Sequence, residues 1–434
     1  MKPSPLRIRP TLPGALLAAL LAAACATPPA PPVQPPAPVE SRQPTPRAPL
    51  GAVPPASTQP LPPLYPVAPG SPMPPLPAPG LPPLSPPPAI GPQGQALVVR
   101  LLPPTATRDR AGWAADIDSA FNALGLVPSA ENYCAAIAVI EQESTFQADP
   151  AVPGLPKIVW REIETRRAKY MIPKLALDAA LSKPSPNGRS YRQRIDALGT
   201  EREMSELFGD MIDELPGGKL LLSGYNPVRT GGPMQVSVAY AEQHARARPY
   251  PLAGKGTLRD AVFSRRGGLY FGIAHLLDYP VPYRDPLYRF ADFNAGHYSS
   301  RNAAFQQAVA QLSGQRLVLD GDLLSYVNGV PSAATSSTQR AVFGLASRLG
   351  LSRDEIQAGL RLEKEESFYR SKVYQRVFQL ADATAGRPVP RELVPRIDLK
   401  SPKIRSKITT AWFADRVKMR YGHCMDRAAL ARSL

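Results

Sequence analysis

Cysteine and histidine are scarce in this chain of 434 residues, which contains three cysteines and four histidines. His244, His275, His297 and His423 are scattered and lack the spacing of metal ligands, so we expect neither a metal nor a cofactor. The chain also lacks zinc-finger spacing and a glycine loop of the kind that cradles phosphates. Together with the N-terminal segment described next, this argues against nucleic acid as a partner.

Long apolar runs are also absent, apart from one near the N-terminus. Lys2, Arg7 and Arg9 precede an apolar stretch at 14–24, which is too short to span a bilayer as a helix. Residues 1–25 are therefore typical of a secretion signal. Because no other segment is long and apolar enough for a membrane span, we expect the remainder to be a soluble periplasmic protein.

The signal ends in Leu21-Ala22-Ala23-Ala24-Cys25, which resembles the lipobox of bacterial lipoproteins. The resemblance implies that Cys25 is lipidated and becomes the first residue of the mature chain. Ala26 follows the cysteine, and by the same resemblance this favours the periplasmic face of the outer membrane. The alternative is an ordinary cleaved signal with an incidental cysteine, since Ala22 stands where the lipobox prefers leucine.

Proline dominates the next segment, with 28 prolines among the 65 residues from Pro28 to Pro92. Proline fixes φ and removes a backbone donor, so this composition predicts a disordered linker over 26–95. Polyproline spacing would let it reach up to roughly 200 Å when fully extended.

The formal net charge is +16, of which residues 1–95 carry +4 (five Lys/Arg and one Glu), leaving +12 on 96–434. A basic secreted protein is suited to an anionic neighbour such as the cell wall or an acidic lipid surface. Of the cysteines after Cys25, Cys134 and Cys424 either pair in this oxidising compartment or remain two buried thiols.

Apolar spacings of three and four residues recur through the rest of the chain, which predicts a mainly α fold. Strand patterns are limited to Ala96–Leu102 and Arg316–Leu319. We expect a helix that begins after Ser129 and runs to Glu143 or Ser144. We expect further helices within Ile158–Lys183, Tyr191–Leu215, Leu269–Leu277, Ala303–Leu312, Gln339–Leu349, Arg353–Leu362, Glu366–Leu380 and Ile408–Tyr421. The predicted organisation is a catalytic body at 105–325 with a helical insertion at 151–230, then an accessory helical region at 330–434.

Glu143 is the strongest candidate for chemistry. Cleavage of a glycosidic bond requires a proton on the departing oxygen, and burial among apolar groups keeps a carboxyl protonated. Glu143 ends the predicted apolar helix and lies roughly 60° from the centre of its apolar face. The alternative is an exposed charge at a helix end.

Three short segments follow one another in the order of a known family: Gln142-Glu143-Ser144-Thr145-Phe146, Gly232-Pro233-Met234-Gln235-Val236 and Phe293-Asn294-Ala295-Gly296. This order resembles the soluble lytic transglycosylases, lysozyme-like enzymes that cut the glycan strands of peptidoglycan. Their pattern is Glu-Ser, then Gly-Leu-Met-Gln, then Ala-Tyr-Asn-Ala-Gly. The whole chain, with its anchor and spacer, also resembles an uncharacterised family of bacterial lipoproteins.

The resemblance implies a lysozyme-like domain in which Glu143 is the single acid and base and the product carries a 1,6-anhydro ring. It implies that Ser144 orients the acid or contacts substrate, and that Met234 and Gln235 line the sugar site. Asn294 would support the site by hydrogen bonding. For Met234 the alternative is core packing, and for Gln235 and Asn294 it is a turn or cap residue.

The sequence departs from the family pattern at three points. Pro233 replaces the usual leucine, and Phe293 replaces a tyrosine that in the family can help to hold the acid. Either Tyr270 or Tyr298 could compensate for that tyrosine. Glu143 and Gly232 are 89 positions apart (232 − 143), whereas the family has a short loop there. The insertion at 151–230 could form a lid, lengthen the glycan groove or bind a partner.

Two other hypotheses about the function remain open. Asp149 or Asp292 could act as the second carboxylate of a hydrolytic muramidase. The chain could also be a wall-binding scaffold that keeps the groove without the chemistry. Tyr225, Tyr240 and Tyr270 are the aromatic residues that could stack on sugars, and each could instead belong to the core.

Overall fold

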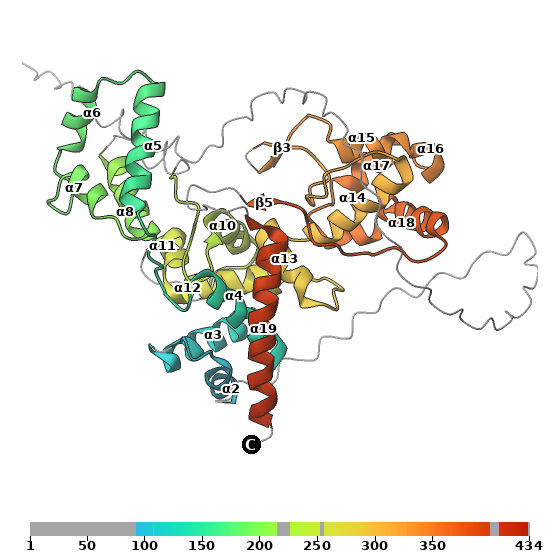
Figure 1. The fold of residues 1–434 in the computed structure, drawn as a ribbon, viewed down its shortest axis with the longest axis horizontal. Helices are drawn as coiled ribbons and strands as arrows, with labels where there is room; N and C mark the ends of the chain where they lie inside the picture. The colour runs from blue at the N-terminus through green and yellow to red at the C-terminus, as the bar shows by residue number, and fades with distance from the viewer. Residues whose placement is uncertain are drawn as a thin grey trace, which may run out of the picture. The chain divides into compact units, whose positions relative to one another are not determined.

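The computed structural model describes residues 93–106, 108–214, 226–251, 256–327, 329–399 and 408–432 (Figure 1). The described chain is mainly helical, which confirms the prediction of a mainly α fold. Its strands form three antiparallel pairs of two residues each. These are β1 Thr230–Gly231 with β2 Val236–Ser237, β3 Tyr326–Val327 with β4 Val330–Pro331, and β5 Asp398–Leu399 with β6 Ile408–Thr409.

Cys25, Tyr225 and residues 26–92 of the predicted linker lie outside the described residues. Residues 93–95, also predicted as linker, instead begin the helix α2 Gln93–Leu101. Within the described residues, no helix combines the length and the apolar character that crossing a membrane requires.

The first hydrophobic core holds all three motif segments. Its helices are α2 Gln93–Leu101, α3 Arg110–Leu124, α4 Ala130–Glu143, α10 Val238–Ala247, α11 Leu258–Phe263, α12 Arg265–Leu277, α13 Pro286–Ala295 and α19 Thr410–Arg432. Every residue of α4 from Tyr133 to Ile140 is buried. α19 packs along both α4 and α13, and Figure 1 shows it in red beside them.

Local sequence explains where α4 begins. Ser129 has extended backbone angles, and its hydroxyl accepts a hydrogen bond from the N–H of Asn132, so it satisfies one of the free donors of the first turn. The predicted cap at Ser129 and the predicted end at Glu143 are both confirmed.

A second core lies among α14 Ser299–Ser313, α15 Ser337–Gly344, α16 Ala346–Leu349, α17 Arg353–Leu360, the 3-10 helix η3 Glu366–Arg370 and α18 Lys372–Ala385. Arg301 is fully buried there and donates to the carbonyls of Glu363 and Glu365. Packing therefore divides the chain differently from the predicted ranges. α14 was expected in the catalytic body, but its buried residues contribute to the second core. α19 was expected in the accessory region, but its buried residues contribute to the first core.

The predicted insertion is helical and has a core of its own. It contains α5 Leu155–Lys169, α6 Lys174–Leu181, α7 Tyr191–Asp196 and α8 Glu201–Asp213. Capping boxes at Ser190 and Thr200 start α7 and α8. The backbone N–H of Val152 donates to the Gly199 carbonyl at 2.8 Å, which ties the start of the insertion to the start of α8.

Both predicted strands are wrong. Ala96–Leu102 lies almost entirely in α2, because Val98, Leu101 and Leu102 follow helical spacing and are buried together. Arg316–Leu319 is irregular, with Val318 exposed and Leu319 buried. A short apolar run does not distinguish a strand from a buried helix by periodicity alone.

Candidate functional site

Glu143 is the last residue of α4 and is half-buried. Ser144 follows it as a buried residue whose hydroxyl donates to the Ile140 carbonyl at 3.0 Å, so this hydroxyl caps the helix in the structure. Thr145 and Phe146 have left-handed φ values of 49° and 58°, a conformation that costs a non-glycine residue about 1–2 kcal/mol. The chain therefore turns sharply after the carboxylate.

Phe146 holds this turn in place. Its ring packs edge-on against Trp113 of α3 with 5.2 Å between ring centroids, and both side chains belong to the first core. The arrangement fixes Glu143 at the boundary between an apolar interior and the surface.

The second motif is a tight turn between β1 and β2. Gly232 has φ 72°, and a Cβ there would come within 2.3 Å of the Val262 carbonyl oxygen, so a side chain does not fit. Gln235 has φ 49°, and its backbone N–H and its side-chain amide both donate to the Gly232 carbonyl. In this structure Gln235 is a satisfied turn residue.

Met234 is fully buried in the first core and packs against Gly272 of α12. A Cβ at Gly272 would come within 2.5 Å of the Met234 Cβ and Sδ atoms. The structure thus gives Met234 the alternative role, core packing, and not a place on an open sugar-binding wall.

The third motif is held by α19. The side-chain oxygen of Asn294 accepts a hydrogen bond from the hydroxyl of Thr410, the buried first residue of α19, at 3.1 Å. Phe293 stacks on Phe413 with 6.4 Å between ring centroids and 9° between ring planes. Asn294 therefore ties its turn to the C-terminal helix.

A disulfide joins Cys134 in α4 to Cys424 in α19, with 5.5 Å between their Cα atoms. Of the two alternatives for these cysteines, the structure contains the pair. The same helix, α19, thus contacts the helix that carries Glu143 and the turn that carries Asn294.

Neither aspartate of the hydrolytic alternative stands as an open second carboxylate. Asp292 is fully buried and accepts hydrogen bonds from the backbone N–H groups of Tyr298 and Ser300 and from the hydroxyls of Tyr279 and Tyr283. Burial raises the pKa of Asp292 to about 6. It is a structural acceptor at the start of α14.

Asp149 lies in the segment after Glu143 and forms an ion pair of 2.8 Å with Arg202 of α8. This contact joins that segment to the insertion, so Asp149 also has a structural partner.

A half-buried cluster that contains Tyr240, His275 and His297 lies beside the third motif and was not predicted from the sequence. One ring nitrogen of His275 hydrogen-bonds the Phe293 carbonyl at 3.2 Å, and His297 hydrogen-bonds the His275 carbonyl at 2.7 Å. Tyr240 packs against both imidazoles. Burial lowers the pKa of His275 to about 3 and that of His297 to about 4, so both are neutral at pH 7.

The tyrosines considered as substitutes for the family's tyrosine both have other surroundings. Tyr270 is fully buried among Tyr250, Phe271 and His244. The ring of Tyr298 lies 4.3 Å from the guanidinium carbon of Arg301, on the side of the second core. Within the described residues, no group of three or more His, Cys, Asp or Glu side chains is arranged to hold a metal ion.

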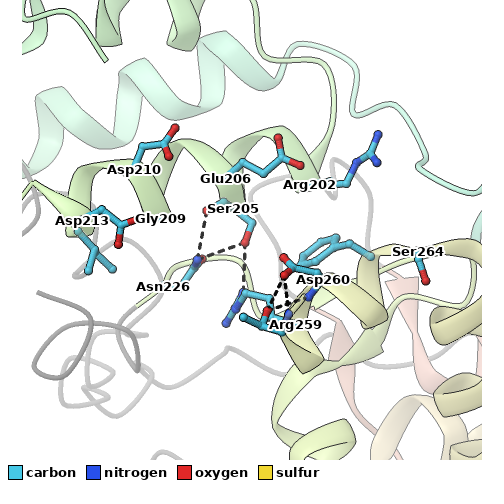
Figure 2. Close-up of a pocket in the computed structure, with 13 residues that line it drawn as sticks. Arg202, Ser205, Glu206, Gly209, Asp210, Asp213, Asn226, Arg259, Asp260 and Ser264 are labelled. Carbon is cyan, nitrogen blue, oxygen red and sulfur yellow. Dashed lines mark hydrogen bonds between the residues drawn. The ribbon is translucent and has the colours of Figure 1, made fainter. Parts of the chain in front are cut away.

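A cleft of about 670 Å³ lies between α8 of the insertion and α11 of the first core (Figure 2). α8 contributes polar side chains that include Arg202, Ser205, Glu206 and Asp210, and the other wall includes Thr257, Arg259, Asp260 and Phe263. The sequence-predicted site residues do not line it.

Hydrogen bonds close the floor of this cleft. The amide of Asn226 and the guanidinium of Arg259 both donate to the Ser205 hydroxyl, and Arg259 also donates to the Val228 carbonyl at 2.6 Å. Figure 2 shows Asn226 and Arg259 converging on Ser205. Burial lowers the pKa of Arg259 from its ordinary value.

Each wall of the cleft is linked to a motif segment. Arg202 pairs with Asp149, six positions after Glu143. Phe263 packs against Gly231, where a Cβ would come within 2.2 Å of its ring, and Gly231 immediately precedes the second motif. The insertion thus forms a cleft wall beside the motif-bearing core.

Comparison with known proteins adds a family but no activity. Residues 106–427 match the family model described as "Protein of unknown function (DUF1615)". The chain is similar to "Uncharacterized protein YaiW" of Escherichia coli strain K12, with 49% identity over 332 residues that cover 76% of this chain and 90% of that protein. No solved structure matches the chain. Because the family model covers most of its length, the chain belongs to the DUF1615 family.

Proposed function

We propose that this protein is a lytic transglycosylase with a lysozyme-like catalytic body, which cleaves the bond between N-acetylmuramic acid and N-acetylglucosamine in peptidoglycan. One observation carries the proposal. Three segments that match the family pattern in order, and that lie far apart in the sequence, all border the first hydrophobic core. A chance match of short motifs gives no reason for them to border one core.

In the proposed reaction Glu143 is the only acid and base. Its protonated carboxyl donates a proton to the glycosidic oxygen as that oxygen leaves C1 of N-acetylmuramic acid. The resulting carboxylate then accepts the proton of the C6 hydroxyl of the same sugar, while the C6 oxygen bonds to C1 and closes the 1,6-anhydro ring. Atoms balance without water, so the reaction is non-hydrolytic.

The neighbouring residues act by positioning. Ser144 closes the end of α4 through Ile140, which sets the direction in which the Glu143 side chain leaves the helix. Asn294 is held by Thr410, and its amide N–H₂ group can donate to substrate while its oxygen accepts from Thr410. Gln235 would have to release Gly232 before its amide could bind an N-acetyl group.

The insertion supports a longer binding groove. A cleft of about 670 Å³ with carboxylate, hydroxyl, amide and guanidinium groups suits a hydrated polar polymer better than an apolar ligand. Because its walls are tied to Asp149 and Gly231, we assign it to the continuation of the substrate beyond the motif-bearing core.

The cellular place of this reaction is part of the proposal. A lipid on Cys25 would hold the chain at the periplasmic face of the outer membrane, and the proline-rich linker would let the body reach the peptidoglycan layer. Glycan strands are then the partner.

We favour the transglycosylase hypothesis over hydrolysis, because both candidate second carboxylates have structural partners. Asp292 is buried and accepts hydrogen bonds, and Asp149 is paired with Arg202. Hydrolysis with inversion or retention requires a second carboxylate that faces the sugar. The scaffold alternative requires the same groove without turnover, so only an activity measurement separates it from the enzyme.

The test compares release of soluble fragments from purified peptidoglycan by the mature chain, Glu143→Gln and Glu141→Gln. Glu141 is a matched control, since it is a half-buried glutamate two positions earlier on the same helix. We expect Glu143→Gln to abolish release and Glu141→Gln to retain it. Equal activity of the two variants would refute the assigned role, and no release by the unchanged chain would favour the scaffold.

A further inference from the structure

The Tyr170–Leu175 turn, which joins α5 to α6 and includes the first two residues of α6, exposes an unusual amount of apolar surface. Met171 is 87% exposed and Leu175 is 82% exposed, the two highest values among the large hydrophobic residues that the structure describes, and Tyr170 beside them is also exposed. Ile172, which lies between them in the sequence, packs against the hydrophobic core of the insertion. The turn lies at the upper left of Figure 1. Ile172 attaches it to the insertion, whereas Met171 and Leu175 stay exposed.

The backbone of the turn is ordered by hydrogen bonds. The N–H of Met171 donates to the Ala168 carbonyl at 3.2 Å, and the N–H of Ile172 donates to the Arg167 carbonyl at 2.9 Å. Met171 has a left-handed φ of 53°, a conformation that glycine or asparagine would adopt more easily. A rigid turn that presents methionine in this conformation can bind a surface with little further loss of conformational entropy.

Basic residues outnumber acidic residues in the sequence around these apolar residues. Residues 157–178 contain six Lys/Arg and three Asp/Glu, a net charge of +3 (6 − 3). Lys169 precedes the turn and Lys174 lies within it, and the Lys169 Nζ is 5.6 Å from the centre of the Tyr170 ring. Lys174 pairs with Asp178 but its side chain remains 68% exposed, so its ammonium is open to a second anion.

We propose that the Tyr170–Leu175 turn docks into the surface of an anionic phospholipid bilayer. Met171 and Leu175 enter the boundary of the acyl chains, the Tyr170 ring lies at the level of the headgroups, and Lys169 and Lys174 contact lipid phosphates. Apolar and aromatic side chains with lysines next to them are the combination that binds bilayer interfaces. Basic residues add attraction to anionic lipid.

Charge and size favour lipid over protein as the occupant. A second copy of this chain would bring the same positive surfaces together, which is unfavourable. Three exposed side chains on a turn also fall short of the roughly 800 Å² per partner of a stable protein interface. A bilayer needs only a few inserted side chains when another attachment shares the binding, as a lipid on Cys25 would, although the proposal does not depend on that anchor.

The test is sedimentation of the chain from Ala26 onward, which lacks the lipid-bearing Cys25 and keeps every described residue, with vesicles of equal parts phosphatidylcholine and phosphatidylglycerol. Met171→Glu/Leu175→Glu should lower vesicle binding about tenfold or more, because both inserted side chains are lost. Binding by the unchanged chain should also fall with added salt and be weaker on phosphatidylcholine alone.

The matched control is Val318→Glu/Leu430→Glu, which replaces two other exposed apolar residues and adds the same two charges. It should bind vesicles like the unchanged chain. Equal losses in the two variants, or no vesicle binding by the unchanged chain at low salt, would overturn the proposal. Concentration-dependent dimers that disappear in Met171→Glu/Leu175→Glu, without vesicle binding, would assign the turn to a second copy instead.

This docking can be separated from the proposed function. The turn is outside the motif segments, so Met171→Glu/Leu175→Glu should release peptidoglycan fragments as the unchanged chain does. Vesicle binding is measured without peptidoglycan, so its result tests the docking proposal independently of catalysis.

Discussion

The disulfide between Cys134 and Cys424 closes a loop of 290 positions and fastens α19 to α4. For a loop of that length, the chain-entropy relation gives about 5.7 kcal/mol of stabilisation at 25 °C, and measured losses on removing native disulfides are about 2–5 kcal/mol. We therefore expect Cys134→Ala/Cys424→Ala to lower the free energy of unfolding of the first core by about 3–5 kcal/mol.

Urea unfolding followed by tryptophan fluorescence measures this change. Trp113 lies in the first core, so replacing Trp160 and Trp412 by phenylalanine in all proteins leaves one reporter of that core. The unchanged cysteine pair measured with a reducing agent is the control and should shift in the same direction. A change smaller than about 0.5 kcal/mol in both measurements would refute the view that this bond braces the motif-bearing body.

Two further predictions concern the first core and its surroundings. The pKa values of His275 and His297, about 3 and 4, are below the unfolded value of 6.5, so their contribution to stability is complete above pH 6.5 and is lost as the pH falls toward 4. Asp292, with its pKa raised to about 6, offsets one histidine, and thermal denaturation should show a net loss of about 1.4 kcal/mol per pH unit between 6 and 4. A melting temperature that rises over this range would contradict the burial of neutral imidazoles. Gly272→Ala forces a Cβ against Met234 and should lower the free energy of urea unfolding by about 1–2 kcal/mol despite the better helix propensity of alanine, whereas a gain would show that Met234 has room to move.

Local signals made much of the fold predictable. The Ser129 cap and the apolar run to Ile140 are properties of adjacent residues, and both ends of α4 follow from them. The insertion was expected to be helical and is, because its capping boxes and apolar spacing are local too. The strand predicted at Ala96–Leu102 failed because a short apolar run fits either periodicity.

Long-range contacts explain what the sequence could not supply. Nothing near Thr410 indicates that it would donate to Asn294, 116 positions earlier, or that Phe413 would stack on Phe293. The histidines 22 positions apart carry no ligand spacing, yet α12 and the turn after α13 bring His275 and His297 into contact. Such pairings depend on how helices pack, which is a property of the whole core.

The same limit applies to the candidate site. The motif order singled out Glu143, and its place at the edge of a buried helix follows from local sequence. The role of Met234 was ambiguous, because a buried methionine and a groove-lining methionine look alike in sequence. Its contact with Gly272, which assigns it to the core, exists only in the packed structure. The sequence motifs could not predict the cleft beside α8, because its walls come from two separate hydrophobic cores.

The most direct test of the central proposal is the mass of the fragments that the mature chain releases from purified peptidoglycan. A transglycosylase that uses Glu143 alone predicts muropeptides with 1,6-anhydro ends, lighter by one water than hydrolysis products, and none from Glu143→Gln. Fragments with free reducing ends would contradict this account and assign the protein to the hydrolases, with a second carboxylate still to be found.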